Sequence, residues 1–337
     1  MKRYIIVMLM TVLVAISLAG CTSAAAPETE EVEEVLEIEE TTEAEEIDPV
    51  RYVIEFPLGR YSTLRDIETE MMRSRVVSNR AFVYFGEHYN NPAGLDVLEA
   101  EISRILLDMD GHFANYRHLI STDPVMEPSH AQGELDGFAS LEEAIVYYIQ
   151  YVAAIVAASD GGDLAEMIQL SRDITAAGAE AMGWHQSFHI PTHEFIFGIG
   201  DYHPELEAPF RRYSLLRDFD VALLNIERVM TRTVMYMYLD DPEVVSSLVP
   251  MLTIVGEVLG AGFGQYRYNL QADSATIQAD LDELQALEIA MSDFYGYAVR
   301  MLMLAEDADQ AMELLHGSAA AASEARNHIG QMIDNIF

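Results

Sequence analysis

Basic residues and cysteine are scarce in this sequence, and each scarcity excludes a class of protein. The 337 residues include 19 Lys and Arg against 56 Asp and Glu, which gives a formal net charge of −37. A protein that neutralises nucleic-acid phosphates needs a basic surface, so we expect no nucleic-acid partner. The single cysteine excludes a disulfide framework and cysteine-rich zinc or iron–sulfur sites. The only lysine is Lys2, so arginine supplies the basic side chains of the rest of the chain.

Residues 1–20 have the pattern of a secretory signal peptide. Lys2 and Arg3 precede an apolar stretch, Tyr4–Ser17, that is too short to span a bilayer comfortably. The segment closes on Leu18-Ala19-Gly20-Cys21, which resembles a bacterial lipoprotein box. The resemblance implies cleavage before Cys21 and acylation of the protein there, for example with palmitate. It predicts an extracytoplasmic protein that a lipid holds at the cell membrane.

Residues 21–49 predict a disordered acidic tether. Between Glu28 and Asp48, eleven Glu and one Asp occur without any basic residue. Such a run repels itself and favours an extended, solvated chain. Apolar residues make up 50% of the whole sequence, so beyond the tether we expect a folded body with a hydrophobic core.

An internal repeat extends over this body. Tyr61-Ser62-Thr63-Leu64-Arg65-Asp66 recurs 152 residues later as Tyr213-Ser214-Leu215-Leu216-Arg217-Asp218. Further matches follow at offsets of 152, 150 and 146, and they include Arg80 with Arg232, Tyr84 with Tyr236, Arg117 with Arg267, Glu142 with Glu288, and Asp163 with Asp309. An offset that drifts slowly, and only where loops are expected, indicates two copies of one unit.

Each copy has the periodicity of helices. In the second copy, one buried seam is predicted by positions 216, 219, 223, 226, 230, 233 and 237. Helix breaks are predicted at Asn90-Asn91-Pro92, Gly161-Gly162, Asp240-Asp241-Pro242 and Glu306-Asp307. Four helices of roughly 20–30 residues in each copy, joined by short turns, predict an antiparallel bundle. The predicted fold is therefore all-α, with two tandem antiparallel four-helix bundles formed by the repeat, at 50–190 and 213–337, and a linker at 191–212.

One stretch, Ala144–Ala158, is nearly all apolar. It is short for a membrane span and contains Gln150, so we interpret it as a buried bundle helix. We expect no second hydrophobic span, which leaves the lipid as the only membrane anchor.

Histidines concentrate around the predicted linker. His185 and His189 are four residues apart, so their rings would share one face of a helix, and His193-Glu194 follows. This is a spacing that divalent-metal sites use. Pro191 is expected to end the helix before His193. The alternative is that the histidines line a bundle junction or lie at the surface. No hydrolase or cysteine-nucleophile motif occurs, so we expect no catalysis and no cofactor other than such a metal.

The repeated Arg–Tyr pairs are candidates for ligand contact. They are Arg80 with Tyr84, Arg232 with Tyr236, Arg117 and Arg267. An arginine that faces inward between helices could fork onto a carboxylate ligand while tyrosine closes the pocket. The alternative is that each arginine pairs with an acidic neighbour or favours a helix C-terminus.

The segment Arg232–Pro242 looks like the end of the first helix in four-helix-bundle sensor domains of bacterial chemoreceptors and histidine kinases. Two such bundles in one region are similar to the helical bimodular sensor modules of that group. The resemblance implies binding of small molecules, often organic acids, between helices. We expect no signalling helix or kinase beyond Phe337, so a sensed ligand would be reported to a membrane signalling protein or simply held.

Two other functions are compatible with the sequence. Imelysin-like metal-uptake proteins also pair helical bundles and use a His-x-x-Glu element, whereas His193 and Glu194 are adjacent here. A structural or protein-binding scaffold is the third hypothesis. Acid binding requires inward arginines in a pocket, and metal binding requires His185, His189 and a carboxylate to converge. A scaffold requires neither and should expose an apolar patch.

Overall fold

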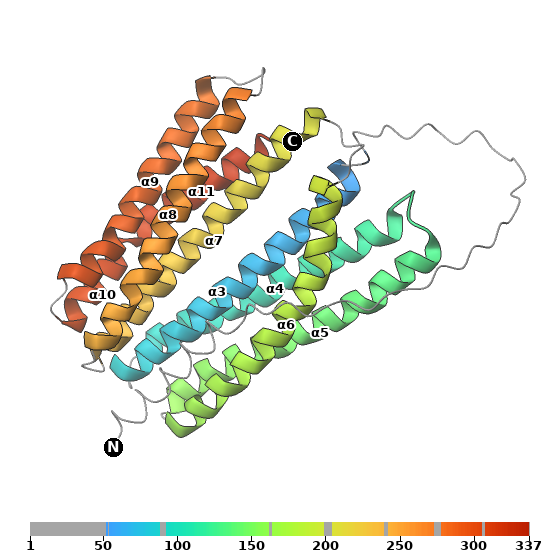
Figure 1. The fold of residues 1–337 in the computed structure, drawn as a ribbon. Coiled ribbons are helices and arrows are strands. Elements are labelled where there is room, and N and C mark those ends of the chain that lie inside the picture. Colours follow the sequence, from blue (N-terminus) through green and yellow to red (C-terminus); the bar gives the residue numbers. More distant parts are fainter. Residues whose placement is uncertain are drawn as a thin grey trace, which may run out of the picture.

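The computed structural model describes residues 52, 54–87, 92–161, 164–198, 204–238, 242–272, 278–304 and 307–336. Within these residues the protein consists of helices and short turns, without strands, so the predicted all-α class is confirmed (Figure 1). The predicted signal peptide (1–20), the tether (21–49) and Cys21 lie outside the described residues.

The helices form two groups that each enclose an apolar cluster. The first half contains a short π-helical turn, η1 (Ile54–Leu58), and α3 (Gly59–Glu87), α4 (Pro92–Thr122), α5 (Pro128–Gly161) and α6 (Leu164–Gly198). The second half contains α7 (Pro204–Tyr238), α8 (Pro242–Ala272), α9 (Gln278–Leu304), α10 (Ala308–Gly317) and α11 (Ala319–Asp334). The groups lie side by side, with α3 and α7 in the middle of the molecule (Figure 1).

The predicted helix breaks coincide with helix ends. α4 and α8 begin at Pro92 and Pro242, where a proline costs little because the first N–H of a helix has no partner within the helix. α5 ends at Gly161. Asp307 caps α10, because its side chain accepts a hydrogen bond of 2.9 Å from the backbone N–H of Gln310.

The predicted linker at 191–212 is helical over the residues that the structure describes there. α6 continues through Pro191 to Gly198, and α7 begins at Pro204 and includes Pro209. A proline inside a helix removes one backbone hydrogen bond, and long helices that pack on neighbours can tolerate that loss. Pro191 therefore does not end the helix, and the backbone of His193 remains helical.

The last helix of the second half is divided, whereas the repeat predicts four helices in each copy. α10 ends at Gly317 and α11 begins at Ala319. Between them the Ser318 hydroxyl donates a hydrogen bond of 2.7 Å to the carbonyl of Leu315. Glycine favours helix weakly and serine competes for backbone groups, so this pair is a plausible place for a break. The counterpart α6 is continuous.

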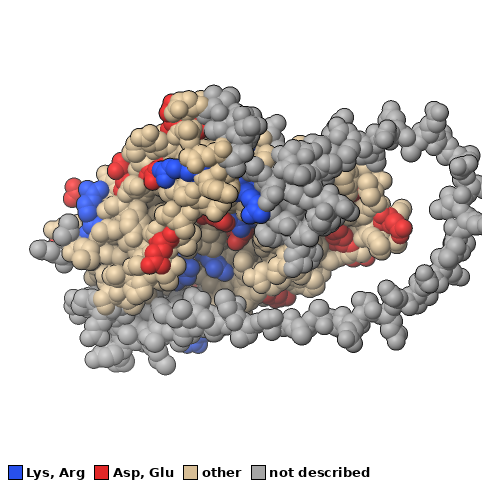
Figure 2. All heavy atoms as spheres, turned by 45° about the horizontal axis from the view of Figure 1, so that its top comes forward, with Lys and Arg blue, Asp and Glu red and all other residues tan. Residues whose placement is uncertain are grey.

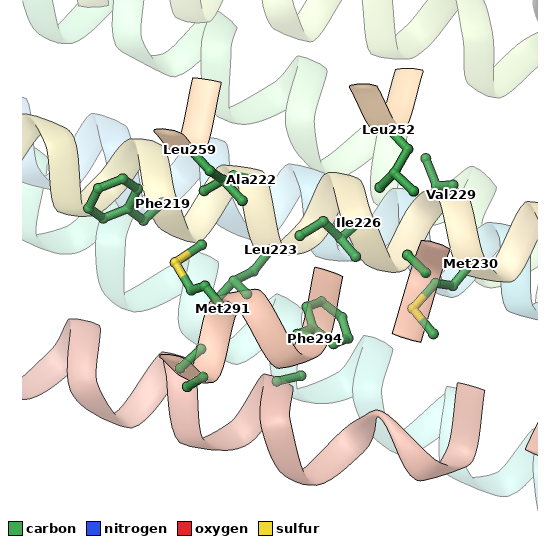
Figure 3. Packing of buried hydrophobic residues seen from close by; sticks show 14 of the residues in the cluster. Phe219, Ala222, Leu223, Ile226, Val229, Met230, Leu252, Leu259, Met291 and Phe294 are labelled. Atoms are coloured by element: carbon green, nitrogen blue, oxygen red, sulfur yellow. The ribbon is translucent and has the colours of Figure 1, made fainter. Parts of the chain in front are cut away.

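The predicted seams are buried. Figure 3 shows Phe219, Leu223, Ile226 and Met230 along α7, with Met291 and Phe294 of α9 in the same cluster. The residues of α3 that match positions 216, 219, 223, 226, 230 and 233 at the offset of 152 are buried as well: Leu64, Ile67, Met71, Ser74, Ser78 and Ala81. The 3.6-residue periodicity thus located the core faces of α3 and α7 correctly.

Two helices, rather than one, are long and apolar enough to cross a membrane by length and composition alone. One is Pro128–Asp160, which includes the stretch Ala144–Ala158, and the other is Val245–Gln271 in α8. Sequence reasoning singled out only the first of these two apolar stretches. In the first of them Ile145, Val152 and Ile155 are fully buried in the cluster of the first half, as a bundle helix requires.

Parallel packing of α3 against α7 joins the two halves, and the repeated hexapeptide lies at this contact. The hydroxyl of Tyr61 is 3.1 Å from that of Ser214, and the hydroxyl of Tyr213 donates a hydrogen bond of 2.6 Å to that of Ser62. Tyr61 corresponds to Tyr213 in the repeat, and Ser62 to Ser214. The same contact is therefore made twice with the roles of the copies exchanged.

The charged residues of the hexapeptide also make one contact twice, with the roles of the copies exchanged. Arg65 pairs with Asp218 at 2.7 Å, and Arg217 pairs with Asp66. A contact in which residue i meets j while the counterpart of i meets the counterpart of j is the mark of a two-fold axis. The crossed contacts of the two hexapeptides define a local axis of this kind between α3 and α7.

Candidate anion-binding site

Arg117 and Arg267 lie at matched surface positions. Arg117 donates a hydrogen bond of 2.7 Å to Glu142, and Arg267 pairs with Glu288. Half of the Arg117 side chain and 43% of the Arg267 side chain are exposed. Each joins the second and third helices of its copy, which favours the interpretation as an acidic-neighbour pair over ligand contact.

Arg80 is also paired, at a more buried position. Its guanidinium donates a hydrogen bond of 2.9 Å to Glu101 and pairs with Glu227 of α7. Arg326 of α11 donates a second hydrogen bond, of 3.0 Å, to Glu227. Tyr84 lines the cavity beside them. Two carboxylates thus balance the charges of two arginines here.

The predicted histidine cluster is partly engaged in the packing of α6 on α3. Nε2 of His185 donates a hydrogen bond of 2.8 Å to the carbonyl of Leu64, and burial lowers the pKa of this ring, which favours its neutral form. The ring of His189 stacks on that of His185, with centroids 5.5 Å apart. The side chains of His193 and Glu194 lie outside the described residues. Among the described side chains, no three metal-ligating groups converge.

Arg232 lies in a different environment, a cavity of about 470 Å³ between α3, α5, α6 and α7. We call it the three-arginine pocket, because Arg75 of α3 and Arg228 of α7 line it together with Arg232. Its other described lining residues are Ser78, Asn79, Tyr148, Ile174, Thr175, Gly178, Ala179, Met182, Gly183 and Gln186. The pocket therefore contains side chains from both halves of the chain.

The charge of this pocket is uncompensated by the described residues. Its described lining contains no Asp or Glu, in a protein whose formal net charge is −37. Burial, together with the neighbouring Arg232 and Arg75, lowers the pKa of Arg228 to about 9. Burial and Arg75 also lower the pKa of Arg232. Guanidinium groups are cations, so like charges repel one another inside the cavity.

Elsewhere charges are mixed. On the face shown in Figure 2, acidic and basic side chains are interspersed among uncharged ones. The ion pairs of Arg65, Arg80, Arg117, Arg217 and Arg267 described above follow the same pattern. The concentration of arginine in the three-arginine pocket is thus a departure from the rest of the described structure.

Two neutral donors in the pocket also lack acceptors. The hydroxyl of Tyr148 and the side-chain nitrogen of Asn79 are buried without a hydrogen-bond partner. A buried donor that makes no hydrogen bond costs about 1–3 kcal/mol. Three cations and two neutral donors around one cavity form an arrangement that an anion with several acceptor oxygens would satisfy.

Sequence reasoning identified one of the three arginines. Arg232 was selected because it matches Arg80 in the repeat, but Tyr236, its predicted companion, is buried in the core of the second half and is not among the described residues that line the pocket. Arg75 and Arg228 were missed because their repeat counterparts are Glu227 and Val76. A signal was present in the i, i+4 spacing of Arg228 and Arg232, since like charges one turn apart are unfavourable without a reason.

Comparison of the chain with protein-family models, with curated proteins and with solved structures finds no match.

Proposed function

We propose that this protein binds a small organic acid in the three-arginine pocket and acts as a non-catalytic, sensor-like binding protein. The observation that carries the proposal is the convergence of Arg75, Arg228 and Arg232 around a cavity whose described lining holds no carboxylate. Arginine presents a planar fork of donors that matches carboxylate geometry, and such charge-assisted hydrogen bonds are stronger than those between neutral groups. The unpartnered hydroxyl of Tyr148 supplies a further donor.

The proposed architecture is a pair of tandem four-helix bundles related by the repeat. Its support is the separate apolar cluster of each half and the reciprocal contacts between α3 and α7. The bound acid would touch Arg75 from one half and Arg228 and Arg232 from the other, so it would tie the halves together. With Cys21 acylated, as the lipoprotein box suggests, this contact would be made outside the cytoplasm, next to a membrane signalling partner.

The experiment is a thermal-unfolding screen of the protein against mono-, di- and tricarboxylates, with sulfate and phosphate as inorganic anions. A ligand that binds only the folded state at a hundredfold excess over Kd stabilises it by about 2.7 kcal/mol. We expect an acid to raise the unfolding temperature by several degrees, and the rise to disappear in Arg232→Ala. Arg117→Ala is the matched control, because it removes a half-exposed arginine that does not line the pocket.

The unliganded variants provide a second readout. Removing one of three mutually repelling cations should leave the protein without ligand as stable as before or more stable. Removing an arginine that holds the fold together would instead lower the stability. Arg228→Met is therefore expected to raise the unfolding temperature without ligand and to abolish the response to the acid. A response that persists in Arg232→Ala, or no response to any of these anions, would contradict the proposed function.

A further inference from the structure

A second cavity lies on the other side of the α3–α7 contact. Its volume is about 260 Å³, and it is lined by side chains of α3 and α7 together with residues of α4, α9, α10 and α11. We call it the closed pocket. Arg80, Glu227, Thr231 and Phe294 are among its lining residues. The three-arginine pocket has the corresponding position relative to α5 and α6 of the first half.

The repeat offsets pair the linings of the two cavities. At an offset of 152, Arg80 of the closed pocket corresponds to Arg232 of the three-arginine pocket, and Thr231 corresponds to Asn79. At the offset of 146 found for the third helices, Phe294 corresponds to Tyr148. The two cavities are therefore the two copies of one site, related by the axis that also relates the Tyr–Ser contacts.

One further pair reverses its charge. Glu227 of the closed pocket corresponds, again at 152, to Arg75 of the three-arginine pocket. In the closed pocket the carboxylate of Glu227 is buried and accepts hydrogen bonds from both Arg80 and Arg326. In the other copy the corresponding position adds a third cation instead of a carboxylate. Glu227 thus supplies Arg80 with a carboxylate partner, and Arg232 has no such partner among the described residues that line its pocket.

We infer that the closed pocket is a second anion site whose acid is built into the chain as Glu227, and that the exchange of Glu227 for Arg75 decides which copy takes an acid from solution. This inference rests on the proposed function. It assigns Glu227 the position that the carboxylate of a bound acid takes opposite Arg232. It also makes the number of acids bound by one chain a property of these two positions.

Neutralising Glu227 should allow the closed pocket to bind an anion. Arg80 would keep its hydrogen bond to Glu101, whereas Arg326 would lose its ion pair with Glu227. The cavity would therefore gain net positive charge. Both arginines are partly exposed, with side-chain exposures of 28% and 32%, so water can solvate them and the fold should survive the change. The cavity of about 260 Å³ has room for a small carboxylate or for sulfate.

The test is calorimetric titration of the full chain with succinate and with sulfate as probes. The protein is expected to bind one anion, Glu227→Gln two, and the double variant Glu227→Gln with Arg80→Ala one again. Glu142→Gln is the matched control, since it neutralises the partner of an exposed arginine, and it should leave the number at one.

The reverse change tests the other copy. Arg75→Glu introduces a carboxylate opposite Arg232, so binding should fall at least a hundredfold, whereas Arg75→Gln, which removes the charge alone, should weaken it about tenfold. An equal loss in the two variants would overturn the inference, as would a folded Glu227→Gln protein that still binds one anion. If the unsubstituted protein binds neither probe nor any acid of the screen, the proposed function itself fails. If Glu227→Gln does not fold, the comparison of Arg75→Glu with Arg75→Gln tests the inference by itself.

Discussion

At the scale of single residues, the protein stores unfavourable charge at Arg228. Its side chain is half-buried, and burial with two neighbouring arginines lowers its pKa to about 9, below the ordinary value of an arginine. The unfolded chain keeps the ordinary, higher pKa, so between the two pKa values the unfolded state binds more protons than the folded state. The contribution of this group to stability is therefore least favourable below pH 9 and improves as the pH rises above 9.

Anion affinity should have the opposite dependence on pH. When the pH passes about 9, Arg228 loses its proton and the pocket loses one cation, so an acid should bind about tenfold more weakly at pH 10 than at pH 7.5. Calorimetric titrations at the two pH values measure this. Arg228→Gln should bind weakly and with little change over the same range. An affinity that stays constant in the unsubstituted protein would show that this arginine does not contact the anion.

At the scale of elements, α6 is shaped by small residues where it meets the pocket. A Cβ built on Gly178 would lie 3.1 Å from Cε2 of Tyr148 and 3.7 Å from an Nη atom of Arg75. A Cβ on Gly183, further along the same helix and also lining the cavity, would meet nothing within 4 Å. The close approach of α6 to α3 and α5 therefore depends on one of the two glycines.

Gly178→Ala and Gly183→Ala form a matched pair for this helix. Each gains up to about 1 kcal/mol of helix propensity. In Gly178→Ala the methyl group must push aside the ring of Tyr148, which lines the pocket, so the gain should be lost and anion affinity should fall at least fivefold. Gly183→Ala should be more stable than the unsubstituted protein and bind the anion unchanged. Urea unfolding and calorimetry test both variants, and equal behaviour would refute this account of α6.

At the scale of the whole molecule, the contact between the two halves is reciprocal, as at the interface of a symmetric dimer. The Tyr–Ser and Arg–Asp contacts of α3 and α7 occur in crossed pairs, so four of the six side chains of the repeated motif have a partner in the other copy. The two cavities that lie beside this contact differ in volume, in uncharged lining residues such as Phe294 and Tyr148, and in the charges that line them.

Double-mutant cycles can measure this symmetry. Tyr61→Phe with Ser214→Ala, and Tyr213→Phe with Ser62→Ala, should each show a coupling energy of about 0.5–1 kcal/mol in the free energy of unfolding. The control cycle combines Tyr61→Phe with Ser62→Ala, whose residues are neighbours in sequence and belong to different crossed pairs, and its coupling should be near zero. Coupling that is absent from both crossed pairs would mean that α3 and α7 do not pack in this way.

The sequence by itself determined the elements, because the signals for them are local. Seam residues such as Leu216 and Ile226 recur with the helical period, and Pro92 and Pro242 begin helices because of their own backbone chemistry. The repeat pointed to the matched positions, including Arg232. The prediction that Pro191 ends a helix was wrong, since packing of a long helix can outweigh the loss of one backbone hydrogen bond.

Only the tertiary structure decided which charges meet. Arg75 comes from α3 and Arg228 from α7, which are more than 150 residues apart in sequence, and they share a cavity because the two helices pack in parallel around the repeat axis. The matching that detected the repeat passed over Arg75 because Glu227 takes its place in the other copy. That difference neutralises one pocket and leaves three cations in the other, and Coulomb interactions of this kind depend on distance in space rather than on distance along the chain.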